Sequence, residues 1–103
     1  MFIVLYKWRI KPGLERQFTE NWSALTQYFL ESCGSLGSRL HVGDDGLYYG
    51  YAQWPDAAAR DNARLDVGLE HARLHMKEAI EESFPETVLE SIDDYLRLPT
   101  LTE

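Results

Sequence analysis

Two side chains in the segment 38–43 are of types that carry proton transfer and anion binding. Histidine is the side chain that most often acts as a general base in proteins, so His41 is a candidate general base. The guanidinium of Arg39 can hold a phenolate or a carboxylate through charge-assisted hydrogen bonds. Because the two residues are two positions apart in an expected strand, both side chains lie on one face of it. We interpret His41 as the candidate catalytic base and Arg39 as its anion partner.

The neighbours of this pair depend on the turn Asp44-Asp45-Gly46, since an Asp-Gly sequence is typical of a hairpin loop. A two-residue loop places Arg39 and His41 opposite small residues, which leaves space for a ligand beside Tyr48 and Trp54. A three-residue loop instead places the pair with the alternate residues of the next strand. Those residues are Tyr49, Tyr51 and Gln53. Both registers are open, and so is a structural role for the pair within a dimer interface or at its rim.

The first expected helix, 14–32, carries a second group of candidate residues. Its apolar residues recur at spacings of three and four and form one stripe, made of Leu14, Phe18, Trp22, Leu25 and Phe29. Asn21 borders this stripe beside Trp22, and a polar group there needs a hydrogen-bond partner. A substrate oxygen in a pocket between helix and sheet would satisfy it, whereas a backbone carbonyl would make Asn21 structural. We assign Asn21, Trp22, Tyr51 and Trp54 as candidate substrate-binding residues.

Two histidines in the second helical stretch have the spacing of a metal-binding pair. His71, His75 and Glu78 share one face of a helix, because they are four and three residues apart. That face points away from the apolar stripe, and Glu70 and Glu82 lie nearby, which favours a solvated surface. We therefore expect no metal site and no cofactor.

The remaining pattern predicts the elements that position these residues. Strands are expected at 2–10, 38–43, 47–54 and 86–96. Helices are expected at 14–32 and from Asp56 to about Phe84, the second in one piece or in two with Asp66 as the inner cap. This βαββαβ order predicts a ferredoxin-like α+β fold, a four-stranded antiparallel sheet with both helices on one face. The domain is expected to span 1–97, and 98–103 to form a C-terminal tail.

Composition narrows the classes of partner. The 103-residue chain has a net charge of −7, and its 10 basic residues are scattered, which argues against nucleic acid and against an anionic membrane surface. Cys33 is the single cysteine, so no intramolecular disulfide can form. No apolar run approaches the ~20 residues of a membrane helix. These features favour a cytoplasmic protein.

The second face of the expected sheet predicts a homodimer. Two helices cover one face only, and the other face of a monomer would then be polar. Here the strand LYYGYAQW carries aromatic side chains on both faces, and the first strand carries large apolar residues on both. An uncovered aromatic face marks an interface. We therefore expect the sheet face to pack on a partner copy.

Four segments, YKWRIKPG, FTENW, CGSLGSRLHVGDDGLYYGYAQWPD and ESIDDYL, together extend over nearly the whole chain. Their most specific parts are Lys11-Pro12-Gly13 after the first strand and Tyr51-Ala52-Gln53-Trp54-Pro55 at the end of the third. Together they resemble the antibiotic biosynthesis monooxygenase (ABM) family of dimeric α+β barrel proteins. The resemblance implies two ferredoxin-like subunits whose sheets face each other, with a pocket in each subunit between sheet and helices.

The same resemblance suggests a function. Members include cofactor-free monooxygenases that oxidise polycyclic phenols with O2, which implies a cofactor-independent monooxygenase-like protein acting on a small aromatic or polycyclic phenolic substrate. One alternative is a non-catalytic dimeric barrel that binds a small apolar ligand. Another is a haem-binding or haem-degrading relative, in which a histidine of the second helix ligates the iron.

Overall fold

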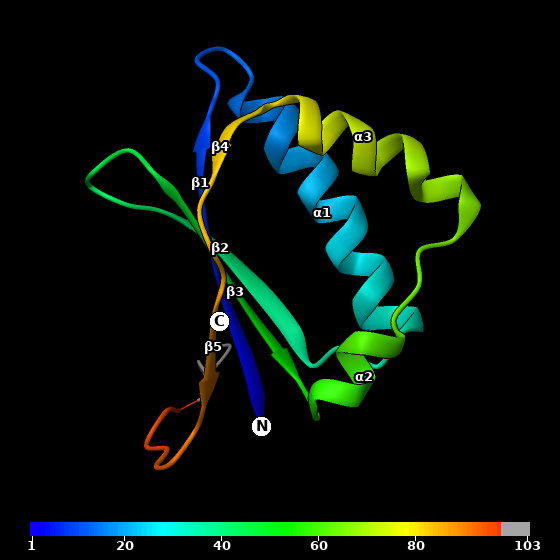
Figure 1. Ribbon diagram of the computed structural model, residues 1–103, viewed down its shortest axis with the longest axis vertical. Coiled ribbons are helices and arrows are strands. Elements are labelled where there is room, and N and C mark those ends of the chain that lie inside the picture. The colour runs from blue at the N-terminus through cyan, green and yellow to red at the C-terminus, as the bar shows by residue number, and fades with distance from the viewer. Residues whose placement is uncertain (98–103) are drawn as a thin grey trace, which may run out of the picture.

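The computed structural model of this chain describes residues 1–97, so the expected tail at 98–103 lies outside the described residues. Within them, one antiparallel sheet carries helices on a single face (Figure 1). The sheet order is β2-β3-β1-β4, and β5 also pairs with β1. This arrangement confirms the expected α+β, ferredoxin-like fold.

The elements differ from the expected ones mainly in the second half of the chain. They are β1 (Phe2–Ile10), α1 (Glu15–Ser32), β2 (Gly37–Val42), β3 (Tyr48–Trp54), α2 (Ala57–Asn62), the 3-10 helix η1 (Val67–Leu69), α3 (Glu70–Glu78), β4 (Ile80–Ser83) and β5 (Thr87–Glu90). The first four agree with the expected elements to within one residue at each end.

The core lies between the sheet and α1. The alternation in β1 turns Val4, Trp8 and Ile10 toward the helices, where each is at most 8% exposed. The apolar stripe of α1 meets them through Phe18, which is fully buried and contacts Trp8 edge-on with ring centroids 5.0 Å apart. Burial of one such side chain contributes about 1.5–3 kcal/mol, so this contact fixes α1 on the sheet.

The β2–β3 hairpin has a three-residue loop. The Gly43 N–H donates to the Leu47 carbonyl at 2.8 Å, which leaves 44–46 as the loop. Gly46 has φ +82°, a left-handed conformation that glycine adopts without a steric penalty, and the Asp45 carboxylate accepts from the Leu47 N–H at 3.0 Å. The two-residue register is therefore wrong, because the left-handed residue closes a longer loop.

The second helical stretch is interrupted. Asp56 caps α2 as expected, since its side chain accepts from the Ala59 N–H at 2.8 Å. Asp66 is the residue directly before η1, but its side chain forms no capping hydrogen bond. The expected capping role of Asp66 is therefore wrong. Helix α3 ends at Glu78 rather than near Phe84.

The segment beyond α3, expected to be helical, forms β4 on the edge of β1. The Lys11 N–H donates to the Ala79 carbonyl and the Phe84 N–H to the Lys7 carbonyl, each at 2.9 Å. These bonds hold both ends of the segment beside β1. Pairing with an open strand edge thus outweighs the helical preference of Glu81 and Glu82, because propensity is a weak term beside tertiary hydrogen bonds.

The last strand is shorter than the expected 86–96. Strand β5 pairs with the first half of β1, and β4 pairs with its second half, so the two share one edge of the sheet. Glu90 pairs with Phe2, so β1 has no further residue for the chain to pair with. Ile92 and Leu96 beyond it are 95% and 83% exposed, which corrects their assignment to a strand.

Candidate functional site

A cavity of about 280 Å³ lies between α1, α2 and the helix-covered face of the sheet. Its walls are largely aromatic: Trp8 comes from β1, Trp22 and Phe29 from α1, and Trp54 from β3. Phe29 and Trp54 meet edge-on with centroids 5.9 Å apart. Apolar walls with few polar groups are the usual setting of a small-molecule site, and this volume is at its small end.

One side of the cavity wall is polar. Arg60 of α2 donates from Nη2 to the Tyr6 hydroxyl at 3.1 Å and to both carboxylate oxygens of Glu86 at 2.9 Å. Within residues 1–97 these are the only hydrogen bonds of this guanidinium, so Nη1 and Nε keep their donors for another group. The arrangement presents a half-buried positive charge beside aromatic rings.

The environment of Tyr6 favours its neutral form. Burial raises the pKa of the Tyr6 hydroxyl above its ordinary 10.0, and the nearby Arg60 charge opposes this rise only in part. The Tyr6 ring stacks on Trp8 with centroids 5.4 Å apart and an interplanar angle of 4°. Tyr6 is therefore fixed as a neutral hydroxyl in the cavity wall.

Trp54 contributes an unusual polar atom. The residue is 5% exposed, and its indole Nε1–H has no hydrogen-bond partner among residues 1–97. A buried donor left unpaired costs about 1–3 kcal/mol, and most such groups in folded proteins are paired.

The candidate residues named from the sequence fall into separate places. Trp22 and Trp54 line the cavity. Arg39 and His41 pair with Tyr51 and Tyr49 across the hairpin, which places them on the sheet face away from the helices. There Arg39, His41 and Tyr51 line a groove of about 790 Å³. Of the two groupings left open by the sequence, the one with Tyr49 and Tyr51 is therefore confirmed and the one with Trp54 is wrong, because the hairpin loop has three residues.

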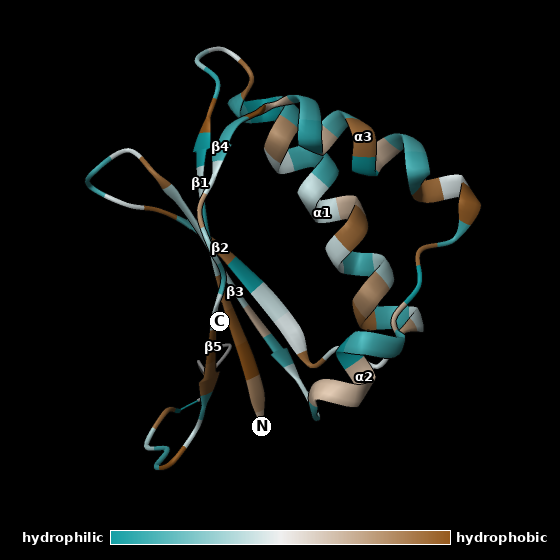
Figure 2. Cartoon of the chain, viewed as in Figure 1, coloured by the Kyte–Doolittle hydropathy of each residue, from teal (hydrophilic) through white to brown (hydrophobic). Residues whose placement is uncertain are grey.

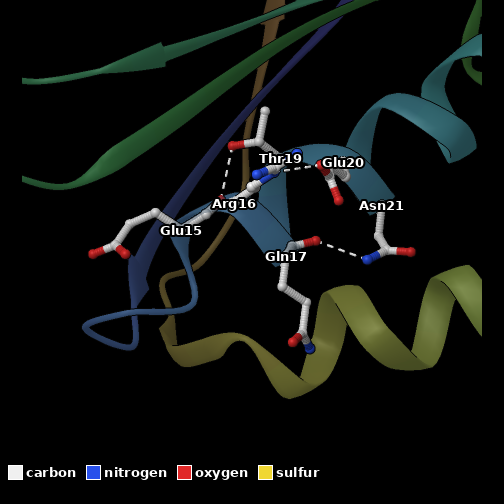
Figure 3. A network of polar contacts seen from close by, with 6 residues as sticks. All are labelled: Glu15, Arg16, Gln17, Thr19, Glu20 and Asn21. Carbon is white, nitrogen blue, oxygen red and sulfur yellow. Dashed lines mark hydrogen bonds and ion pairs between the residues drawn. The ribbon is translucent and has the colours of Figure 1, made fainter.

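Asn21 lies outside both hollows. Its side-chain amide donates to the Gln17 carbonyl one turn earlier at 2.8 Å (Figure 3). The backbone partner is the structural alternative considered above. A substrate contact of Asn21 stays a prediction.

The histidine pair on α3 is also apart from the cavity. The rings of His71 and His75 lie 4.0 Å apart, while Glu78 accepts a hydrogen bond from Gln17. Residues 1–97 contain no group of three or more histidine, cysteine or acidic side chains placed to hold a metal ion. None of the helices in this part of the chain is both long and apolar enough to cross a membrane.

Sequence reasoning missed Tyr6, Arg60 and Glu86. Tyr6 could have been found, because it is the one polar side chain on the inward face of β1. Arg60 and Glu86 are 26 residues apart, and no local spacing signals their contact.

An α+β sandwich of one sheet and one helical layer, with an aromatic cavity between them, is a class of fold shared by many small ligand-binding proteins and enzymes. The family model for antibiotic biosynthesis monooxygenases (ABM) matches residues 1–65. The chain belongs to this family. A comparison with curated protein sequences found no match.

Solved structures share the fold at low sequence identity. Rv0793 from Mycobacterium tuberculosis has a TM-score of 0.74 and 17% identity, with 92% of this chain and 98% of that chain covered. An antibiotic biosynthesis monooxygenase crystal structure has a TM-score of 0.74 and 17% identity, with 90% and 100% covered. SnoaB from Streptomyces nogalater, described as a cofactor-independent oxygenase, has a TM-score of 0.75 and 13% identity, with 93% and 97% covered.

Proposed function

We propose that the cavity beneath α1 binds a small aromatic or polycyclic phenol and that the chain acts on it as a cofactor-independent monooxygenase-like enzyme. The observation that carries this proposal is the Arg60–Tyr6 pair set in an aromatic wall. Membership of the ABM family supports it, and SnoaB, which shares the fold, is described as a cofactor-independent oxygenase.

The chemistry requires an electron-rich substrate anion. A phenol bound beside Arg60 has a lowered pKa, because the guanidinium stabilises the phenolate. The phenolate reduces O2, one oxygen atom enters the product, and the other leaves as water, so the substrate supplies all the electrons. The chain contributes an apolar cavity and fixed donors that stabilise negative charge as it forms.

Arg60→Gln tests this proposal. We expect the wild-type protein to consume O2 with 1-naphthol or 1,5-dihydroxynaphthalene, and the variant to lose about tenfold to a hundredfold in rate, as for a lost hydrogen bond to a charged group. An oxygen electrode measures the rate, and product mass shows whether an oxygen atom has been added.

Arg16→Gln is the matched control, because Arg16 forms an exposed ion pair with Glu20 on α1. Its rate should equal that of the wild-type protein. Equal rates in the Arg60 variant and the control would remove Arg60 from the mechanism. Binding of the naphthols without O2 uptake would contradict the enzymatic role and favour a non-catalytic protein that binds a small apolar ligand.

We also infer that a second copy covers the face of the sheet away from the helices, here called the open face. The residues used in this inference are Leu5, Arg39, His41, Tyr49, Tyr51 and Leu89. Leu5 and Leu89 are 36% and 39% exposed there, and the N-terminal half of β1 is coloured hydrophobic in Figure 2. In this arrangement Arg39 and His41 lie at the dimer interface. They are then not in contact with a substrate in the cavity, in contrast to the catalytic role expected from the sequence.

A further inference from the structure

Two histidines lie side by side on α3, apart from the aromatic cavity. His71 and His75 are one helical turn apart, and their ring centroids are separated by 4.0 Å with an interplanar angle of 54°. His71 is exposed and His75 is half-buried. Within residues 1–97 neither ring forms a hydrogen bond or an ion pair, since the only hydrogen bond to His75 uses its backbone carbonyl. Each neutral imidazole therefore has a nitrogen lone pair available to a ligand.

The packing of α3 fixes the spacing of the two rings. Met76 packs against the core, and Ala79 at the end of the helix is fully buried. Gln17 extends from α1 toward α3 and donates to the His75 carbonyl and to the Glu78 carboxylate, each at 2.9 Å (Figure 3). The backbone that carries the two imidazoles is thus held in place before any ligand binds. A preorganised site of this kind binds with a smaller loss of conformational entropy.

The distance between the rings suits two ligands of one small metal ion. Two Zn–N bonds of ~2.0–2.1 Å join nitrogens that are at most ~4.2 Å apart. Ring centroids 4.0 Å apart are within this reach, and rotation of the rings about their side-chain bonds directs one nitrogen of each to a common point. Neutral imidazole is the commonest metal ligand among side chains, and two histidines four residues apart on a helix are a known zinc-binding arrangement.

The acidic side chains of α3 have other partners, because Glu70 pairs with Arg73 and Glu78 accepts from Gln17. We propose that His71 and His75 bind a divalent ion of the late first-row transition metals through two imidazole nitrogens, with water in the other coordination positions. Copper should bind most tightly and nickel and zinc less so, in line with their general order of affinity. Both nitrogens reach the ion from one side, unlike a haem site, in which one protein ligand occupies the proximal position.

A zinc titration followed by NMR tests the pair directly. The imidazole C–H signals of the three histidines are assigned from single His→Ala variants. We expect Zn²⁺ to shift the signals of His71 and His75 over the same range of metal concentration and to leave that of His41 in place. Mg²⁺ should shift none of the three, because it prefers oxygen ligands.

Calorimetric zinc affinities of three variants give a second readout. His71→Ala, at an exposed position, should weaken binding about tenfold or more, because the second imidazole then no longer acts at a high effective concentration. His41→Ala is the matched control and should keep the wild-type affinity. The double variant His71→Ala with Lys77→His restores the number of histidines but places them two residues apart, where they do not share a helix face. It should bind as weakly as His71→Ala.

Three results would overturn the metal site. The first is a wild-type protein whose His71 and His75 signals do not move at millimolar zinc. The second is an equal affinity in the wild-type protein and in His71→Ala, because one imidazole would then be sufficient. The third is wild-type affinity in the double variant, which would show that the number of histidines matters and their spacing does not. None of these results bears on the aromatic cavity, so the proposed function is tested separately.

Discussion

At Arg60, all hydrogen bonds that the guanidinium forms within residues 1–97 use one nitrogen, Nη2. Nη2 bonds Tyr6 on one side and Glu86 on the other. The Glu86 contact holds Nη2 in place, since both carboxylate oxygens accept from this nitrogen. A side chain fixed in this way loses little conformational entropy when it binds an anion.

The Tyr6 hydroxyl predicts a dependence of stability on alkaline pH. Burial raises its pKa in the folded protein above the 10.0 of the exposed residue, so the unfolded chain ionises first as the pH rises. The stabilising effect is fully present below pH 10 and is lost as the pH rises through the raised pKa. Urea unfolding at pH 8 and pH 10.5 should show a smaller loss of unfolding free energy in Tyr6→Phe than in the wild-type protein.

Tyr6→Phe also removes the hydrogen bond from Arg60, which should cost about 0.5–1.5 kcal/mol at pH 8. Tyr28→Phe is the control, because Tyr28 lies on α1 and forms no hydrogen bond through its hydroxyl within residues 1–97. An identical pH dependence in Tyr6→Phe and in the wild-type protein would contradict a raised pKa at this position.

Single residues explain how far the site was predictable. Trp22 and Trp54 were found because each lies on an inward pattern of its helix or strand. The sheet face of Arg39 and His41 stayed open in the sequence, because the two possible hairpin registers differ by one residue of loop length and place the pair on opposite faces. The Arg60–Glu86 contact joins segments that only the folded chain brings together.

At the scale of elements, the β2–β3 hairpin depends on the conformation of one loop residue. Gly46→Ala should destabilise the protein by about 1–2 kcal/mol, because a side chain is strained at φ +82°. Gly68→Ala in η1 is the control, since its φ is not positive and an added Cβ would meet only Asp66 at 3.5 Å. Urea unfolding measures both, and equal stabilities would argue against the three-residue loop.

The elements show where local pattern suffices. The alternation in β1 and the stripe of α1 predicted both elements, because each buries one face along its whole length. The chain after α3 was misassigned because Glu81 and Glu82 favour a helix, while the free edge of β1 offers backbone partners that the local sequence does not reveal. Strands β4 and β5 share one edge of the sheet because β1 is long enough to pair with both. The local sequence of β4 and β5 does not reveal this either.

At the scale of the whole molecule, the open face predicts a dimer. Light scattering after gel filtration at micromolar concentration should give twice the chain mass of 11.9 kDa. Leu89→Glu should shift the protein toward the monomer, because it places a charge in the apolar part of this face. Leu74→Glu on α3, where the leucine is 50% exposed, should remain dimeric.

A wild-type protein of monomer mass would contradict this assembly. So would an equal effect of the two leucine variants, because it would show that the added charge, rather than the open face, controls association.

The few contacts of helix α2 bear on how a ligand enters and leaves the cavity. It is six residues long, none of them buried, and it is held by its Asp56 cap and by the pair between Arg60 and Glu86. Segments with few buried contacts open at a lower free energy than the core does. Of the elements that line the cavity, α2 is therefore the one that we expect to move most readily, and such a movement would break the contacts of Arg60 with Glu86 and Tyr6.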